Sequence, residues 1–349
     1  MPDKQKELLG GSAGLAGSIV IESGTELGEI EIKARGYWEQ VWTRFKRDKL
    51  ALGGGVTIIL LILVAFIGAP IAQYLLGHSP NDPFFTSGIG SNGQPIGPLS
   101  HVADPFHPGH KTWLFLGADS TLGRDEFLRL LYGAQVSFEV AILATLGSIS
   151  VGVFLGSIAG YYRGWVDTIV SRVTEITMAF PALLFIIALA STVGDSLNNI
   201  TFWGLFGRGV FTLFLILSAF GWFYPARIIR AVVLSLREKE FVEAARMVGS
   251  SDSRIIRSHI LPHLVAPIIV YSTLSVASFI LAEAGLSYLG VGIKLPTSSW
   301  GNLLQQASEY YTTQPWLMVW PGLAVLITTL AFNLLGDGLR DAFDPRATH

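Results

Sequence analysis

Three glutamates lie in or beside long apolar stretches and are the first candidates for chemistry: Glu139, Glu175 and Glu283. Carboxylates within a membrane can relay protons, but they are costly in lipid, and a relay needs them in pairs near mid-membrane. Each of these glutamates lies within a few turns of an expected interface, which favours a structural hydrogen bond or ion pair over contact with a substrate. The lack of a central pair weakens the hypothesis of a proton-driven transporter.

Histidines form a second candidate group, because neutral imidazoles bind Zn²⁺ or Ni²⁺. His101, His107 and His110 occur in a segment rich in Gly, Pro and aromatic residues, with Asp104 as the only carboxylate among them. Pro108 and Gly109 interrupt any helical spacing, and the chain has 0 Cys. We therefore expect no metal site here.

Nucleotide and hydrolytic chemistry have no support in the sequence. The pattern Gly-x-x-x-x-Gly-Lys-Ser/Thr, which cradles phosphates, does not occur in the chain. Neither a Ser-His-Asp arrangement nor His-Glu-x-x-His stands out. We expect a chain that is not an enzyme and binds no cofactor of its own, so that any energy from ATP must come from a partner.

The stretch from Glu243 to Pro262 has the composition of a docking element. Ala244 and Ala245 present a smooth helix face, Glu243 favours the positive end of a short helix, and Gly249 permits a sharp turn or a close approach. The basic residues of the stretch indicate a helix on the cytoplasmic side of a membrane; they are Arg246, Arg254 and Arg257.

These residues resemble the EAA loop of importer-type ABC transporter permeases, which reads Glu-Ala-Ala, three residues, Gly, nine, Ile, one, Leu-Pro. Glu243, Ala244, Ala245, Gly249, Leu261 and Pro262 are in register, whereas His259 occupies the isoleucine position. In the family this loop fits a groove on a separate ATPase subunit. The resemblance therefore implies ATPase docking for these residues and for Arg246; the alternative is that the helix is only a connector.

A second block narrows the family. Residues 117–125 (Gly-Ala-Asp-Ser-Thr-Leu-Gly-Arg-Asp) and 129–134 (Arg-Leu-Leu-Tyr-Gly-Ala) resemble a segment of the C-type permeases of dipeptide, oligopeptide and nickel importers. Read without the family, the block predicts a helix start with Asp119 and Ser120 as caps. Further similarities occur at 281–290, 296–301 and 333–341, so the resemblance covers roughly Tyr37 to Arg346.

The resemblance implies the type I ABC importer permease fold and a set of partners. These are a second homologous permease, two ABC ATPase subunits that bind ATP and Mg²⁺, an extracytoplasmic solute-binding protein and membrane lipid, with no nucleic acid. Peptides are the expected solutes, and nickel or another small solute is the alternative within the family. A secondary transporter without an ATPase is the alternative outside it.

Composition indicates the elements that must position these residues. The chain of 349 residues is 50% hydrophobic and only 14% charged, whereas about a quarter of the residues of soluble domains are charged. Charge-free apolar stretches reach the roughly 18 residues of a spanning helix in six places: 50–76, 140–162, 176–194, 209–226, 264–282 and 312–336. We expect an all-α membrane protein with six transmembrane helices.

The basic residues predict the orientation. Residues 37–49 form an amphipathic basic segment that should hold the N terminus on the cytoplasmic surface, and five of the 24 Lys and Arg then fall outside. The expected order is a flexible tail (1–36), the amphipathic segment, a first span (50–76), an extracytoplasmic loop (77–133), a five-helix core (134–340) with a cytoplasmic docking loop (238–262), and a tail (341–349). Both termini are expected in the cytoplasm; a signal peptide at residues 4–21 is the less favoured alternative.

Helix breakers fall inside two of the spans. Pro181 should kink the third span, and residues 221–225 with Pro225 should break the fourth, which suits either a translocation path or bundle packing. Arg227 and Arg230 follow one turn apart, and snorkelling to the inner interface is the expected explanation.

Overall fold

The computed structural model describes residues 36–84, 87–107, 109–120, 122–197 and 206–344. The chain divides into two units after Gln40, and the fold described below is that of the second unit, which begins at Val41. The expected tail at 1–36 lies, except for its last residue, outside the described residues. Helix α1 (Tyr37–Phe45) begins in the first unit and ends in the second.

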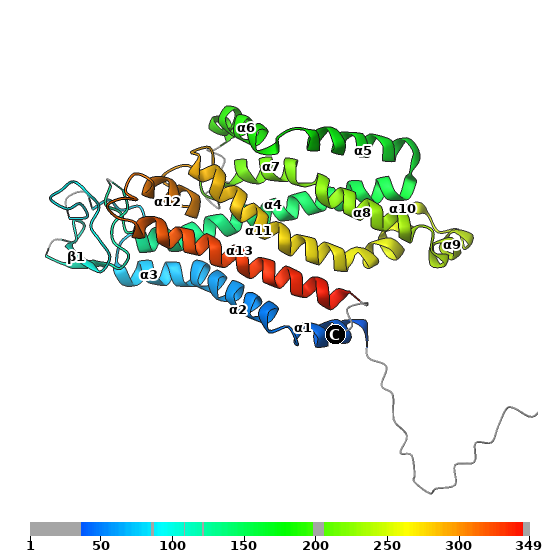
Figure 1. Ribbon diagram of the computed structural model, residues 1–349, viewed down its shortest axis with the longest axis horizontal. Helices are drawn as coiled ribbons and strands as arrows, with labels where there is room; N and C mark the ends of the chain where they lie inside the picture. Colours follow the sequence, from blue (N-terminus) through cyan, green and yellow to red (C-terminus); the bar gives the residue numbers. More distant parts are fainter. Residues whose placement is uncertain (1–35, 85–86, 108, 121, 198–205, 345–349) are drawn as a thin grey trace, which may run out of the picture. The chain divides into compact units, whose positions relative to one another are not determined.

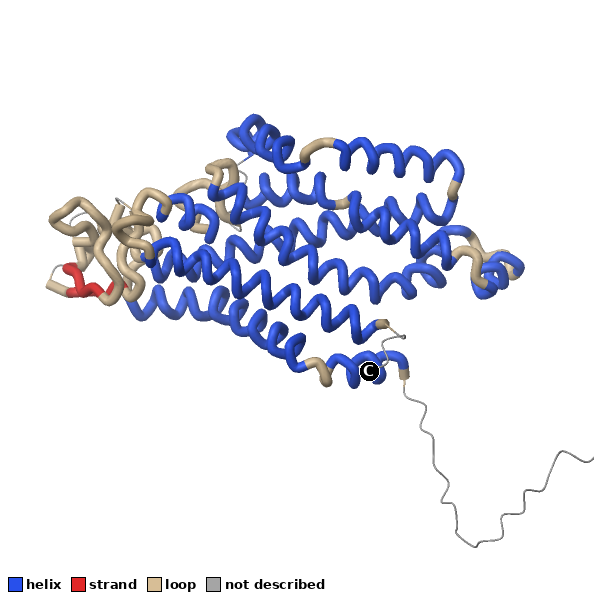
Figure 2. Tube along the Cα trace, in the orientation of Figure 1, coloured by secondary structure: helices blue, strands red, loops and turns tan. Residues whose placement is uncertain are grey.

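The described residues are mostly helical (Figures 1 and 2). The N-terminal half contains α2 (Lys49–Leu63), η1 (Val64–Gly68), α3 (Ala69–Leu76), α4 (Glu126–Tyr162), α5 (Gly164–Ala179) and α6 (Ala182–Leu197). The C-terminal half contains α7 (Val210–Gly221), α8 (Phe223–Leu236), α9 (Glu240–Met247), α10 (Asp252–Arg254), η2 (Ile255–Ile260), η3 (Leu261–Leu264), α11 (Val265–Tyr288), α12 (Trp300–Ala307) and α13 (Trp316–Phe343).

Membrane-spanning helices can be recognised by length and apolarity. Among the described residues, 4 helical segments are long and apolar enough to cross a membrane: Lys49–Leu76, Glu126–Tyr162, Asp252–Tyr288 and Trp316–Phe343. Two bent pairs, α5 with α6 and α7 with α8, raise the number to 6 if each pair is one span.

Strands β1 (Ser100–Ala103) and β2 (Lys111–Leu114) are a small addition to the mostly helical fold that the sequence did not predict. They pair as an antiparallel hairpin within the predicted loop 77–133 and lie at the end of the unit opposite α9 (Figure 1). The loop is also shorter than expected, because α4 already begins at Glu126. Polar residues of its first turns, such as Arg129, are buried against other protein groups, so the helix extends beyond the apolar run.

The proline in the third span breaks the helix rather than bending it. Phe180 is extended (φ −83, ψ 144) because a residue that precedes proline is sterically kept out of the helical region. Helices α5 and α6 meet there at 86°. In the fourth span, α7 and α8 meet at 41°, and Pro225, in the first turn of α8, has no N–H for the Gly221 carbonyl.

The last two spans begin and end elsewhere than expected. Helical structure runs from Asp252 to Tyr288, so the second half of the predicted docking loop is continuous with the fifth span. Helix α13 starts at Trp316 and extends to Phe343, into the predicted tail 341–349, with Pro321 inside it. Apolarity alone did not reveal these ends, because the added turns contain charged residues that helices also accept.

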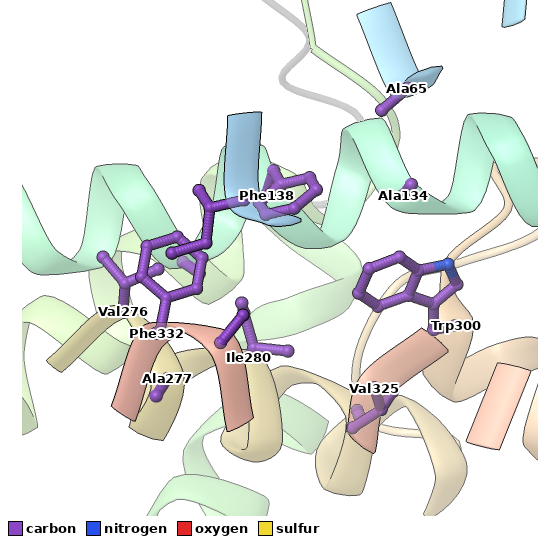
Figure 3. Packing of buried hydrophobic residues seen from close by; sticks show 13 residues of the cluster. Ala65, Ala134, Phe138, Val276, Ala277, Ile280, Trp300, Val325 and Phe332 are labelled. Carbon is purple, nitrogen blue, oxygen red and sulfur yellow. The ribbon is translucent and has the colours of Figure 1, made fainter. Parts of the chain in front are cut away.

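The largest packing cluster lies where α4, α11, α12 and α13 meet (Figure 3). The rings of Phe138 and Trp300 pack edge to face at 5.8 Å, and Phe332 lies on the other side of Phe138 at 6.3 Å. Trp300 is buried, and its indole N–H donates to the Leu130 carbonyl at 3.2 Å. The cluster fixes short α12 against three spanning helices.

A stripe of glycines brings α4 against α8. Gly152, Gly156 and Gly160 follow one another at four-residue spacing on one face of α4. A Cβ at Gly156 would lie 2.5 Å from the Ala226 carbonyl oxygen, and one at Gly160 would lie 2.8 Å from the Arg230 carbonyl oxygen. Such stripes allow close backbone approach where lipid offers no hydrophobic drive for helix association.

The three glutamates have structural surroundings of different kinds. Glu283 is buried and accepts hydrogen bonds of 2.7 Å from the hydroxyls of Ser137 and Ser287. Glu175 forms an exposed pair with Arg172 at 2.7 Å, and Glu139 is half-buried on α4. The structural roles expected for Glu283 and Glu175 are thus found.

Candidate functional site

Helix α9 contains the predicted docking residues and ends in a tight turn. Gly249 has φ +83, Ser250 N–H donates to the Ala245 carbonyl at 3.0 Å, and Gly249 N–H donates to the Arg246 carbonyl at 2.9 Å. These bonds define a Schellman motif, in which a residue with positive φ closes the helix. Glycine is required here because of this positive φ. Lack of space is not the reason, since a Cβ would meet nothing within 4 Å.

The two faces of α9 differ in what they contact. Val242 and Ala245 are buried in a cluster with residues of α8 and of the helix that follows the turn. Glu243, Ala244 and Arg246 are exposed. The predicted docking alanines therefore have different roles, because Ala245 packs inside the chain whereas Ala244 lies on the surface.

An apolar tip follows the exposed face. Met247 is 83% exposed and Val248 is 86% exposed, next to Gly249. Helix α9 projects at one end of the unit, beyond the ends of α2 and α13 (Figure 1). Adjacent apolar side chains with so little cover are typical of a contact surface for another protein.

Leu261 and Pro262 lie in the helix that leads to the fifth span rather than in α9. Residues Ile255–Ile260 form a π-helical segment, and Leu261–Leu264 form a 3₁₀ turn with Pro262 at its start. The rings of Phe241, on α9, and His263 pack at 5.1 Å. The motif residues thus belong to two helices that meet at the Gly249 turn.

Arg230 corrects the snorkelling expectation. Its Nη2 lies 2.7 Å from Asp167 Oδ2, so it joins α8 to α5. Arg163, between α4 and α5, pairs with Glu238 just before α9. The Arg230 pair thus joins α5 to α8, and the Arg163 pair joins the α4–α5 turn to the residues just before α9. Pro181 and Pro225 lie at the helix breaks, apart from α9.

Charged residues of the second sequence block form a buried cluster around the start of α4. Arg124 Nη2 lies 2.6 Å from Asp119 Oδ2, and Arg129 Nε lies 2.9 Å from the same oxygen. Arg124 Nη2 also donates to Gln306 of α12 at 2.8 Å. The block is therefore structural, and Asp119 is not a helix cap as the sequence suggested.

The cap of α4 is Asp125, which also pairs with a histidine. Its Oδ1 accepts from the N–H groups of Phe127 at 2.8 Å and Leu128 at 3.2 Å. Its Oδ2 lies 3.0 Å from His78 Nε2, and both side chains are 0% exposed. Burial raises the pKa of Asp125 to about 7 and lowers the pKa of His78.

The loop histidines have other neighbours. His107 Nδ1 lies 2.9 Å from Asp104 Oδ2, and the His101 ring stacks on Trp113 at 4.8 Å. Within the described ranges, no group of three or more His, Cys, Asp or Glu residues is placed to hold a metal ion.

Sequence reasoning missed Tyr161 and Asp252, which contact each other beside α9. Their meeting depends on tertiary packing and has no sequence signal. It also missed the glycine stripe of α4, which the four-residue spacing of Gly152, Gly156 and Gly160 could have revealed.

Comparison with known proteins places the chain among transport proteins. The family described as binding-protein-dependent transport system inner membrane component matches residues 152–349, and the N-terminal TM domain of oligopeptide transport permease C matches residues 36–86. The dipeptide transport system permease protein DppC of Alkalihalophilus pseudofirmus is 36% identical over 309 residues, which are 88% of this chain and 90% of that protein.

Two other similarities are of different strength. The glutathione transport system permease protein GsiD of Pectobacterium atrosepticum is 35% identical over 309 residues, covering 88% of this chain and 91% of the relative. A chain of the MetNI methionine ABC transporter in an inward-facing conformation superposes with a TM-score of 0.49 at 15% identity, covering 62% of this chain and 97% of that one.

Proposed function

Because the chain belongs to the binding-protein-dependent transport system inner membrane components, we propose that it is a pathway-forming permease subunit of an ATP-driven peptide importer. The observation that carries the proposal is α9, whose exposed face and apolar tip project from one end of the unit. In this proposal α9 docks on an ABC ATPase, which binds ATP and Mg²⁺ and hydrolyses the nucleotide.

The partners follow from what this chain lacks. A complete translocation pathway requires a second homologous permease, and ATP hydrolysis requires two ATPase subunits. Delivery of the solute requires an extracytoplasmic binding protein. In this arrangement six spans cross the membrane, both termini and the docking loop are cytoplasmic, and the β1–β2 hairpin is extracytoplasmic.

The proposed mechanism is a switch between inward- and outward-facing states. Closure of the ATPase pair pushes the two docking helices of the permease pair, and the bent pairs α5–α6 and α7–α8 transmit the movement as a change of packing. The ATPases must have different affinities for the two states, since otherwise ATP would shift nothing. Pro181 and Pro225 are proposed to act in this step through the helix breaks beside them.

Short peptides are the solute class that the relatives favour. The two relatives are named for dipeptide and glutathione transport, and glutathione is itself a tripeptide. Nickel or another small solute is the alternative within the family.

The docking role can be tested at the tip of α9. Val248 is 86% exposed, so Val248→Asp should leave the melting temperature of the purified chain unchanged. A charge placed in an apolar docking surface should nevertheless abolish co-purification of the ATPase and peptide uptake. The measurement is affinity purification of the tagged chain from mild detergent, together with peptide uptake by proteoliposomes of the assembled complex.

Ser253→Asp, which adds the same charge to an exposed position after the turn, is the matched control and should retain the ATPase. Glu243→Lys and Gly249→Trp should uncouple transport in inserted protein. Co-purification of the ATPase with Val248→Asp at the wild-type level would refute the docking role. Proton- or sodium-driven uptake by the isolated chain would instead support a secondary transporter.

A further inference from the structure

Tyr161 lies at the end of α4, where four helical segments meet. It is 3% exposed and belongs to the cluster that buries Val242 and Ala245 of α9. The cluster also contains Ile255 and Ile260, from the helix that continues into the fifth span. Tyr161 thus belongs to a cluster that contains both sides of the Gly249 turn.

Polar contacts of Tyr161 reach the same two sides. Its hydroxyl donates to Asp252 Oδ1 at 2.7 Å, at the first residue of the helix after the turn. The Arg246 guanidinium, on α9, lies 5.3 Å from the ring centroid. Arg237, at the end of α8, lies 5.9 Å from the centroid of the same ring.

These contacts differ in kind and act together. The hydroxyl–carboxylate bond is charge-assisted and directional, whereas the guanidinium groups are attracted to the ring face and tolerate small rotations. The bond therefore fixes the helix after the turn, and the ring holds α9. The Phe241–His263 ring pair and the shared apolar cluster also join the two helices, so Tyr161 acts together with these contacts in setting the angle between them.

We propose that Tyr161 is the positioning residue that joins the docking helix to α4 and to the fifth span, so that a push on α9 moves these helices together. Arg246 acts within the chain as the part of α9 that is held by the ring. This inference rests on the proposed docking function, and it assigns to Tyr161 the transmission of movement rather than the contact with the partner.

The position of α9 can be measured without any partner. The chain contains 0 Cys, so Val248→Cys gives a unique site for a spin label, and Tyr311→Cys, between α12 and α13 and 62% exposed, gives a reference site. Tyr161→Phe removes only the hydroxyl. We expect it to increase label mobility at position 248, to leave mobility at position 311 unchanged, and to keep the melting temperature near that of the parent chain.

Tyr162→Phe is the matched control, because Tyr162 is the neighbouring tyrosine and the residue is 49% exposed. It should leave label mobility unchanged at both positions. Asp252→Ala, which removes the acceptor, should reproduce the effect of Tyr161→Phe, and the double variant should be no worse than either single variant, since both remove the same bond.

Coupling provides the functional measurement. In the reconstituted complex, Tyr161→Phe should lower the peptide transported per ATP about tenfold, in line with the loss of one hydrogen bond to a charged group, while the ATPase still co-purifies. Unchanged mobility at position 248, equal changes at both labels with a lower melting temperature, or additive effects of the two substitutions would overturn the inference. These outcomes are independent of the Val248→Asp result, so the docking role of α9 and the positioning role of Tyr161 can be refuted separately.

Discussion

At the scale of single residues, the His78–Asp125 pair shows how burial selects a protonation state. His78 Nδ1 lies 3.3 Å from the Leu76 carbonyl, which can only accept, so Nδ1 bears a proton and neutral Nε2 accepts from Asp125. With a raised pKa for Asp125 and a lowered pKa for His78, the pair favours a protonated carboxyl and a neutral imidazole. One proton between two buried groups avoids an uncompensated charge.

This pair predicts a pH window for stability. Because the folded-state pKa of Asp125 is raised, its contribution is fully present below the unfolded pKa and is lost as the pH rises through about 7. The contribution of His78, whose pKa is lowered, is present above its unfolded value and is lost as the pH falls through the folded one. Asp125 should therefore lower the melting temperature in detergent by several degrees between pH of about 4 and pH of about 7, the interval between its unfolded and folded pKa.

Asp125→Asn provides the control for that experiment. Asparagine can still cap α4 and can still donate to neutral His78, but it does not titrate. The decrease due to Asp125 should be absent from this variant, so the melting temperature of the wild type minus that of the variant should fall from pH of about 4 to pH of about 7. A difference that stays constant over this interval would contradict the prediction.

At the scale of elements, the glycine stripe of α4 determines how closely α8 can pack. Gly156→Ala would place a Cβ 2.5 Å from a backbone oxygen of α8, which cannot rotate away, so the helices must separate. We expect a loss of about 1–3 kcal/mol, the range for overpacking a well-packed core. Thermal unfolding of the purified variant measures the loss.

Gly285 gives the matched comparison, because it lies in α11 and a Cβ there would meet nothing within 4 Å. Gly285→Ala should be neutral or stabilising by up to about 1 kcal/mol, since alanine is the better helix former. If Gly156→Ala were as stable as Gly285→Ala, close packing at the stripe would not be required.

At the scale of the whole molecule, the proposed topology assigns the two ends of the unit to opposite sides of the membrane. Helix α9 and the β1–β2 hairpin lie at opposite ends (Figure 1). In intact cells, Val248→Cys should be protected from a membrane-impermeant maleimide, whereas Trp113→Cys, on the hairpin and 46% exposed, should react. The chain has 0 Cys, so there is no background labelling from it. Reaction at position 248 with protection at position 113 would reverse the topology.

Local sequence determined the membership in the transport family, most of the apolar helices and the positions of their breaks. The family indicated by the docking and second blocks is confirmed by the matching models and relatives. Apolar runs, prolines such as Pro181, and the glycine at position 249 act on their own neighbourhoods, so they can be read directly. The ends of α4, α11 and α13 were misplaced because charged turns also join a helix when tertiary partners satisfy them.

Only the tertiary structure decided which polar groups meet. Tyr161 and Asp252 are 91 positions apart, and His78 and Asp125 are 47 apart. Asp119 reads locally as a cap, yet it binds Arg124 and Arg129 because the folded chain buries all three together. A buried charge must find a partner wherever packing places one, and that place depends on helix packing that no local pattern specifies.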